Sequence, residues 1–245
     1  MATLSTEELQ QARIDLAASF RWAVRHGLHE GICNHFSVAV GDDQFLINAH
    51  GYHWSEITAS NILLADYDGN IVEGDRPVEP TAFYIHSRVH KACPQAVCVM
   101  HTHMPYATAL TLLEGGRLEP VEQGGLRFHD CAVYDDDYGG LALANSEGDR
   151  IAAKMGNKSV MFMAAHGVIV TGSNVAKTYD HLYYLERACQ VQVLARSTGL
   201  PLRRLPDAVI EKTTAQFAHG NTESAALHFD SLKRILDREE PDYKS

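Results

Sequence analysis

The N-terminal part of the chain has the pattern of an amphipathic helix followed by a β-hairpin. Leu16, Phe20 and Val24 recur at helical spacing behind a capping-box sequence at 5–8, and the pattern stops at Gly27. Apolar and polar residues then alternate over 34–40, and a glycine- and aspartate-containing turn leads into a second apolar run over 45–48. Alternating segments on both sides of a turn predict two paired strands.

The central part predicts strands and helices in alternation. One helical turn is expected over 58–63, followed by a strand and a turn at 68–70. Pro80 suits the first turn of a helix that places Phe83, His86 and Val89 on one side. The apolar run over 96–101 predicts a buried strand, and a helix follows over 105–113.

The C-terminal half continues the alternation. We expect a short strand over 131–134, a helix from Ser146, and a second apolar strand over 160–165 that breaks at His166 and resumes at Val168. Asn174 caps a long helix that extends to about residue 197. The elements together predict an α/β fold, with one domain over 1–200. Residues 201–245 are expected to be a linker and a helical tail that packs on the same domain or on a neighbouring subunit, because the tail carries apolar residues over 225–236.

Composition and charge restrict the possible partners. Hydrophobic residues make up 45% and charged residues 21% of the chain, as in ordinary globular proteins. The formal charge is −10 and basic residues form no stripe, so neither nucleic acid nor an anionic membrane is an expected partner. The chain starts without a signal-peptide pattern, lacks an apolar run of membrane-spanning length, and has five cysteines without a CxxC pair. These features favour a cytoplasmic location.

Histidine is the outlier in composition, with 14 residues. His101 and His103 stand at the end of the first long apolar run, and side chains two positions apart on a strand lie on the same face. Their imidazoles are expected side by side at a strand-to-helix exit, where α/β proteins usually carry their chemistry. His166 is expected at the equivalent exit of the other apolar strand, and Gly167 beside it permits close approach of the backbone.

Three neutral imidazoles from two neighbouring strands can hold a divalent metal ion and leave a coordination position open for water or substrate. An HxH sequence also arises by chance, and a histidine at the end of a strand is usually only solvated. The spacing alone therefore leaves two alternatives, a metal site and three unrelated side chains.

Several motifs, in this order along the chain, resemble the class II aldolase/adducin family. They are Ile32-Cys-Asn-His-Phe-Ser-Val, Phe45-Leu-Ile-Asn-Ala-His-Gly, Ser55-Glu-Ile-Thr-Ala-Ser, Phe83-Tyr-Ile-His-Ser-Arg-Val-His, Val99-Met-His-Thr-His and Ala165-His-Gly-Val-Ile-Val. The resemblance implies a three-layer α/β/α sandwich with a central, mainly antiparallel sheet, and a homo-oligomer, usually a tetramer. It also implies one divalent metal ion per chain, zinc or manganese with iron or cobalt as alternatives, on His101, His103 and His166.

The chain departs from the sugar-phosphate aldolases of that family. Those enzymes have Ser-Ser-Glu before the helix histidine that matches His86, and their catalytic glutamate falls on Ala82 here. Glu79 lies three residues out of register, and Pro80 and Thr81 replace the serines that help to hold a phosphate. The family's tyrosine is expected near Gln123, where this chain has none. In these respects the chain resembles the adducin head and its bacterial relatives.

The remaining candidates have open alternatives. For catalysis we select His86, which is either an acid/base group or a packed histidine, together with Glu122 and Tyr134, the first of which could reach the metal pocket of a neighbouring subunit. For substrate binding we select Asn34 and Gly51, at positions that match the family's phosphate loop, and His50 beside them. Asn34 is equally suited to a structural turn, and His50 to the surface.

Two classes of function remain. Aldol cleavage and decarboxylation both form a carbanion beside an oxygen, which a divalent ion stabilises as an enolate. Loss of the glutamate and tyrosine favours decarboxylation, or an aldol substrate without phosphate. The sequence thus predicts a metal-dependent carbon–carbon lyase that acts on a small hydroxy, keto or aromatic acid. The alternative is a non-catalytic, adducin-like scaffold or binding module.

Overall fold

The computed structural model describes residues 4–245, apart from the side chains of residues 219–222. Helices alternate with strands over most of this range, as the sequence patterns predict. The helices are α1 (Thr6–Arg25), α2 (Pro80–Ala92), α3 (Pro105–Thr111), α4 (Asn145–Met155), α5 (Val175–Arg196) and α6 (Asp207–Glu239), with short 3-10 turns η1 (Trp54–Glu56), η2 (Ala59–Asn61), η3 (Gly125–Phe128) and η4 (Pro241–Lys244).

The strands form a single mixed sheet in the described part of the chain. They are β1 (His35–Ala39), β2 (Gln44–Asn48), β3 (Ile62–Asp66), β4 (Ile71–Glu73), β5 (Cys98–Thr102), β6 (Ala132–Asp135), β7 (Val160–Met163) and β8 (Gly167–Gly172). Their order is β4-β3-β2-β1-β5-β8-β7-β6, and every neighbouring pair is antiparallel except β6 and β7. The expected α/β fold with a mainly antiparallel sheet is confirmed.

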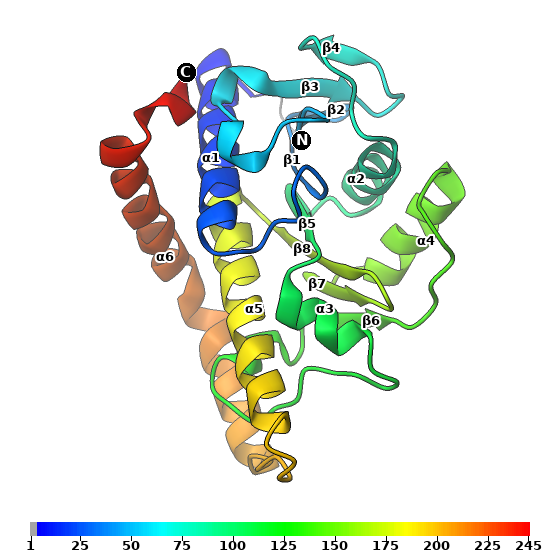
Figure 1. Cartoon of the computed structure of the whole chain (residues 1–245), viewed down its shortest axis with the longest axis vertical. Helices are drawn as coiled ribbons and strands as arrows, with labels where there is room; N and C mark the ends of the chain where they lie inside the picture. Colours follow the sequence, from blue (N-terminus) through cyan, green and yellow to red (C-terminus); the bar gives the residue numbers. More distant parts are fainter. Residues whose placement is uncertain (1–3) are drawn as a thin grey trace.

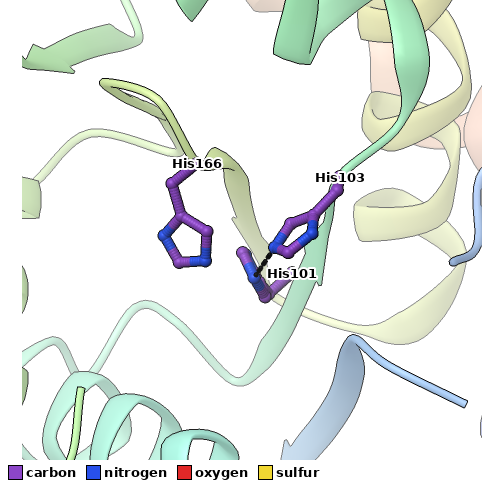
Figure 2. A group of neighbouring side chains, drawn as sticks. All are labelled: His101, His103 and His166. Carbon is purple, nitrogen blue, oxygen red and sulfur yellow. Dashed lines mark hydrogen bonds between the residues drawn. The ribbon is translucent and has the colours of Figure 1, made fainter. Parts of the chain in front are cut away.

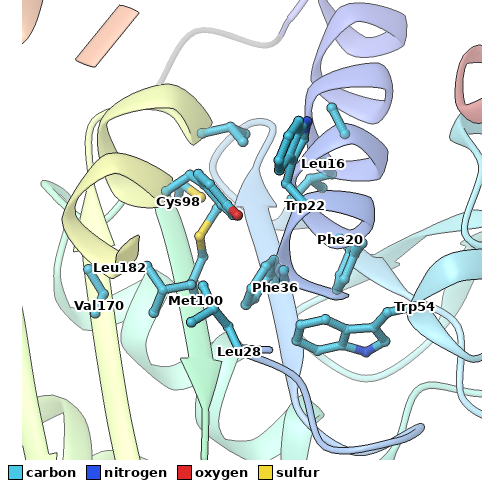
Figure 3. Close-up of a cluster of buried hydrophobic side chains, with 14 of the residues drawn as sticks. Leu16, Phe20, Trp22, Leu28, Phe36, Trp54, Cys98, Met100, Val170 and Leu182 are labelled. Atoms are coloured by element: carbon cyan, nitrogen blue, oxygen red, sulfur yellow. The ribbon is translucent and has the colours of Figure 1, made fainter. Parts of the chain in front are cut away.

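Helices cover both faces of the sheet, and Figure 1 shows the resulting layers. Helices α1 and α5 pack on one face, where Phe20, Phe36 and Trp54 form the aromatic centre of the larger core (Figure 3). Helices α2 and α4 pack together on the other face, over a smaller core that contains Ile85 and Ile151. Alternation along each strand therefore sends side chains to two different cores, which explains the near-continuous apolar runs.

Helix α6 packs on α1 and α5 of its own chain (Figure 1). The indole of Trp22 donates a hydrogen bond to the carbonyl of Leu232 at 3.0 Å, and Arg21 pairs with Glu240 and Asp242 at 3.0 and 2.7 Å. The apolar residues that suggested a surface for a neighbouring subunit are buried against this chain: Ala225, Phe229, Leu232 and Leu236. Packing on the same domain is one of the two placements that the sequence left open for the tail. None of the helices in the described range is long and apolar enough to cross a membrane.

The break expected at His166 is a reversal of the chain. Strand β7 ends at Met163 and β8 begins at Gly167, and these two residues are register partners in an antiparallel pair. Ala165 adopts a positive φ of 53° in the turn between them. His166 therefore lies in a hairpin turn and not at a strand-to-helix exit, which corrects the sequence-based placement. An apolar run without an Asn-Gly signal gives no indication of such a turn.

Candidate metal centre

His101, His103 and His166 converge at one end of the sheet (Figure 2). One nitrogen from each ring lies within 4.8 Å of the corresponding nitrogens of the other two. The ring centroids are 4.7 to 4.9 Å apart, and the three side chains range from buried to half-buried. This is the only group of three or more metal-ligating side chains in the described part of the chain that could hold a metal ion together.

The hydrogen bonds of His101 and His103 determine which ring nitrogen of each is free to bind a metal ion. Nδ1 of His101 lies 3.0 Å from the carbonyl oxygen of Val168, and Nδ1 of His103 lies 2.5 Å from Oε2 of Glu30. Both partners only accept, so each Nδ1 carries the hydrogen and each Nε2 keeps its lone pair. The two Nε2 atoms face one another at 3.1 Å. When both rings are neutral, the two lone pairs repel one another at this distance, and a divalent cation held between them would remove the repulsion.

Burial favours the neutral, metal-binding form of these rings. It lowers the pKa of His101 well below its ordinary value, and burial followed by the neighbouring His103 lowers the pKa of His166 to about 4. Near neutral pH neither ring is protonated, so protons do not compete for these two nitrogens. The donor set therefore fits zinc and similar borderline cations such as iron(II).

Gly167 lets the two halves of the site approach. A Cβ at this position would lie 2.5 Å from the carbonyl oxygen of Thr102 and 2.8 Å from the ring of His103. A larger residue would push the β7–β8 turn, and His166 with it, away from the end of β5. The close approach expected from the sequence is present.

Asn34 holds the backbone of the HxH segment. Its φ is 73°, and its side-chain oxygen accepts a hydrogen bond from the backbone nitrogen of His103 at 3.2 Å. The side-chain amide of Asn48 donates to the backbone oxygen of Asn34 at 3.4 Å. Asparagine tolerates the left-handed region, and here it also links β1 to the metal ligands. These contacts support the structural alternative for Asn34, and its role in substrate binding stays a prediction.

Glu30 has no motif around it, and sequence reasoning missed it. It lies in the loop after α1 and becomes a partner of His103 only when the chain folds. A carboxylate on the far nitrogen of a metal-binding histidine orients the ring and makes it a stronger donor.

We expect Glu30→Gln to weaken divalent-metal affinity by about 10- to 100-fold, because the amide replaces a charge-assisted hydrogen bond with a neutral one. Zinc titration against a competing chelator measures the effect. Glu211→Gln, at an exposed position on α6, is the matched control and should leave the affinity unchanged. Equal affinities of wild type and Glu30→Gln would remove Glu30 from the site.

The catalytic candidates have well-defined surroundings. His86 is fully buried, with both ring nitrogens in hydrogen bonds to His35 and Ser37, which supports the alternative of a packed histidine, and its role in catalysis stays a prediction. The carboxylate of Glu122 accepts hydrogen bonds from the backbone nitrogens of Gly124 and Gly125. It thereby stabilises the loop before η3.

Tyr134, His50 and Gly51 lie apart from the three histidines. The hydroxyl of Tyr134 accepts a hydrogen bond from the backbone nitrogen of Leu118 at 3.1 Å, and its ring lines a cleft of about 370 Å³ that reaches Ala165. His50 and Gly51 are exposed, and Arg76 lies 3.6 Å from the site of a Cβ on Gly51. Roles for these residues in catalysis or substrate binding, as for Glu122, stay predictions.

Glu79, the glutamate nearest to the position of the family's catalytic glutamate, has a structural role. It caps α2, because its carboxylate accepts a hydrogen bond from the backbone nitrogen of Ala82 at 2.9 Å and another from the hydroxyl of Thr81. Ala82 itself is buried in a separate apolar cluster. The match of this position to the family's glutamate stays a prediction.

A small polar cavity adjoins His166 on the side of α4. Tyr138, Arg150 and Glu147 contribute to its lining, and the ring of Tyr138 lies 6.4 Å from that of His166. Arg150 pairs with Asp135 and Glu147 at 2.7 and 2.8 Å, so its charge is balanced by two carboxylates. The half-exposed Tyr138 is therefore a further polar group beside the metal centre.

Comparison with known proteins agrees with this architecture. The model of the class II aldolase and adducin N-terminal domain matches residues 14–193. An aldolase class 2 protein of Caulobacter vibrioides is 35% identical over 237 residues, which cover 95% of this chain and 91% of that protein. The crystal structure of an aldolase II superfamily protein from Pseudomonas syringae has a TM-score of 0.92 at 36% identity, and the match covers 99% of this chain and 98% of that one.

Two more distant relatives differ in their names. The decarboxylase NovR of Streptomyces niveus is 29% identical over 228 residues, which cover 90% of this chain and 84% of NovR. Alpha-adducin of Mus musculus is 33% identical over 187 residues, which cover 74% of this chain and 25% of adducin. The relatives thus include a decarboxylase and a part of a much longer protein.

Proposed function

Because the chain belongs to the class II aldolase and adducin family, we propose that it is a divalent-metal-dependent carbon–carbon lyase. Its substrate is a small, non-phosphorylated hydroxy, keto or aromatic acid, and the reaction is a decarboxylation or an aldol cleavage. The observation that supports this proposal most strongly is the pair of Nε2 atoms, on His101 and His103, that face one another at 3.1 Å. A protein that only binds a partner has no need of this arrangement.

His101, His103 and His166 would hold the ion. When bound, the ion supplies a Lewis acid that withdraws electron density from a substrate oxygen. Glu30 and the carbonyl of Val168 orient the rings, and the buried surroundings keep the rings neutral. The half-exposed Tyr138, whose ring lies 6.4 Å from that of His166, offers a further polar group to a small acid.

The residues around the start of α2 argue against a phosphorylated sugar as substrate. Pro80 supplies no hydroxyl, and the hydroxyl of Thr81 is engaged with Glu79. Ala82 supplies no acid/base group. The chain therefore lacks both the phosphate donors and the glutamate with which the sugar-phosphate aldolases are expected to work. Decarboxylation needs no base that removes a hydroxyl proton, and the relative named as a decarboxylase supports this direction.

A substrate screen tests the proposal. The zinc- and manganese-loaded protein is assayed against α-hydroxy, β-keto and aromatic acids and against L-fuculose 1-phosphate. We expect turnover of at least one acid, loss of that turnover after removal of the metal, and recovery on its return. Efficient cleavage of fuculose 1-phosphate would contradict the proposed substrate class.

The second candidate is a scaffold that uses the fold without turnover. The match to alpha-adducin favours it, because the chain aligns with a part of a protein that is several times longer. Metal binding without turnover of any acid in the panel would favour the scaffold. Absence of metal binding would favour it further.

We also propose a homo-oligomer, in the form of a tetramer, whose metal pocket a neighbouring subunit completes. Several large apolar side chains are exposed in the loops near the end of the sheet that carries the histidines: Leu112, Leu113, Leu141 and Leu143. Exposed apolar groups of this size are typical of surfaces that contact another protein. The single chain, moreover, brings neither Glu122 nor Tyr134 into contact with the histidines.

Equilibrium sedimentation at micromolar concentration is expected to give four times the chain mass, 27.1 kDa, for the tetramer. Leu141→Glu combined with Leu143→Glu should shift the population toward smaller species, because it places charges in an apolar contact. A stable monomer with full activity would contradict the shared site.

A further inference from the structure

A continuous chain of buried hydrogen bonds runs beneath the metal centre, between β1 and α2. Nδ1 of His90 lies 2.7 Å from the carbonyl oxygen of Ala96, and Nε2 of His90 lies 2.7 Å from the hydroxyl of Ser37. The same hydroxyl bonds Nδ1 of His86, and Nε2 of His86 lies 2.7 Å from Nδ1 of His35. The four side chains are at most 6% exposed.

The donors and acceptors in this hydrogen-bond chain can be assigned in only one consistent order. The carbonyl of Ala96 can only accept, so His90 carries its hydrogen on Nδ1 and leaves a lone pair on Nε2. Ser37 donates its single hydrogen to that lone pair and must therefore accept from Nδ1 of His86. Nε2 of His86 then accepts from Nδ1 of His35. Each link forces the next, and the lone pair at the end of the chain is on Nε2 of His35.

Burial keeps the intermediate rings neutral, which this order of donors and acceptors requires. It lowers the pKa of His90 to about 4 and the pKa of His86 well below its ordinary value, the latter with the help of the neighbouring histidines. The opposite direction would leave Nδ1 of His90 without a hydrogen, with its lone pair against the lone pairs of the Ala96 carbonyl. That arrangement is repulsive in a buried site.

His35 lies beside the metal ligands. It is the register partner of His101 across the β1–β5 pair, and the two ring centroids are 4.8 Å apart. Because Nδ1 is occupied by His86, Nε2 is the nitrogen that remains for a ligand at the centre.

We propose that His35 is a substrate-contacting residue, fixed by this hydrogen-bond chain as a neutral acceptor, which takes a hydrogen bond from a hydroxyl group of the substrate at the metal centre. Ser37, His86 and His90 are positioning residues that hold its tautomer. The contact of His35 with a substrate rests on the lyase function proposed above. The tautomer of His35 depends only on the hydrogen bonds within this fold. In this way β1 supplies a polar group that the chain lacks at Ala82.

The first test is neutron diffraction from crystals of the zinc-loaded protein exchanged into deuterium oxide. We expect deuterium on Nδ1 of His35, His86 and His90 and none on Nε2 of His35. Deuterium on Nε2 of His35 would overturn the proposal. This readout needs no substrate, so it stands even if the screen for lyase activity fails.

The second test breaks the chain two links away from His35. In Ser37→Ala the hydrogen on His86 is free to move to Nε2, and His35 is then free to present Nε2–H to the substrate. With the best acid from the screen we expect kcat to fall about tenfold or more, which is the loss of one well-placed hydrogen bond, with zinc content unchanged and a smaller effect on KM.

The control is Ser87→Ala. Ser87 is an equally buried serine on α2, and its hydroxyl donates to the carbonyl of Phe83 on the same helix. The Ser87→Ala variant should keep the wild-type kcat if the lower kcat of Ser37→Ala comes from the broken hydrogen-bond chain. Equal kcat values for the wild type and both variants, in protein that turns over an acid, would contradict a role for His35 and leave the proposed lyase intact. Neutron data from Ser37→Ala should show the changed tautomer directly.

Discussion

We expect the wild-type protein to contain close to one divalent ion per chain, and His103→Ala to lose it. The substitution removes one of three nitrogens and leaves Nε2 of His101 without its counterpart at 3.1 Å. It also leaves the carboxylate of Glu30 without its histidine partner. Loss of a group that merely supports a metal ligand typically costs about 10- to 100-fold in affinity, so loss of a ligand should cost more than about 100-fold.

Elemental analysis of freshly purified protein, followed by zinc titration, measures this effect. His129→Ala is the matched control, because His129 is exposed and lies outside the group of three histidines. The control should bind metal like the wild type, and only His103→Ala should lose lyase activity. Wild-type protein without metal, and without uptake on titration, would contradict the assignment of the site.

Phe36→Ala is expected to cause the largest loss of stability, about 3–5 kcal/mol in the free energy of unfolding. Phe36 is fully buried and stacks on Phe20 at 4.7 Å, with the ring of Trp54 at 4.7 Å on another side (Figure 3). Removal of the ring loses the burial of an aromatic side chain and leaves a cavity that the flanking rings cannot fill. The effect also reaches the site, because Phe36 stands between His35 and Ser37 on β1.

Denaturant unfolding at a fixed protein concentration measures the loss, since assembly would make apparent stability depend on concentration. The control is Ile32→Ala, whose side chain is 44% exposed and should change the free energy of unfolding by less than about 0.5 kcal/mol. A loss below about 1 kcal/mol in Phe36→Ala would show that the aromatic cluster is not the centre of the core.

The sequence by itself determined most elements and the identity of the three histidines of the candidate metal centre. The capping box at Ser5 and Glu8 begins α1 as expected, and Pro80 and Pro105 are the first residues of α2 and α3. The side chains of His101 and His103 lie on one face because a strand repeats every two residues. These features depend on helix caps and on the periodicity of side chains, and residues that are close in sequence determine both.

Only the tertiary structure decided which distant residues meet at the site. The turn that carries His166 depends on how β7 pairs with β8, and Glu30 reaches His103 from a loop without a motif. The order of strands places β1 beside β5, and this brings His35 next to His101. The hydrogen-bond chain that we propose to fix the tautomer of His35 joins residues of β1, of α2 and of the loop before β5. Contacts of this kind follow from strand order and packing, for which the local sequence carries no signal.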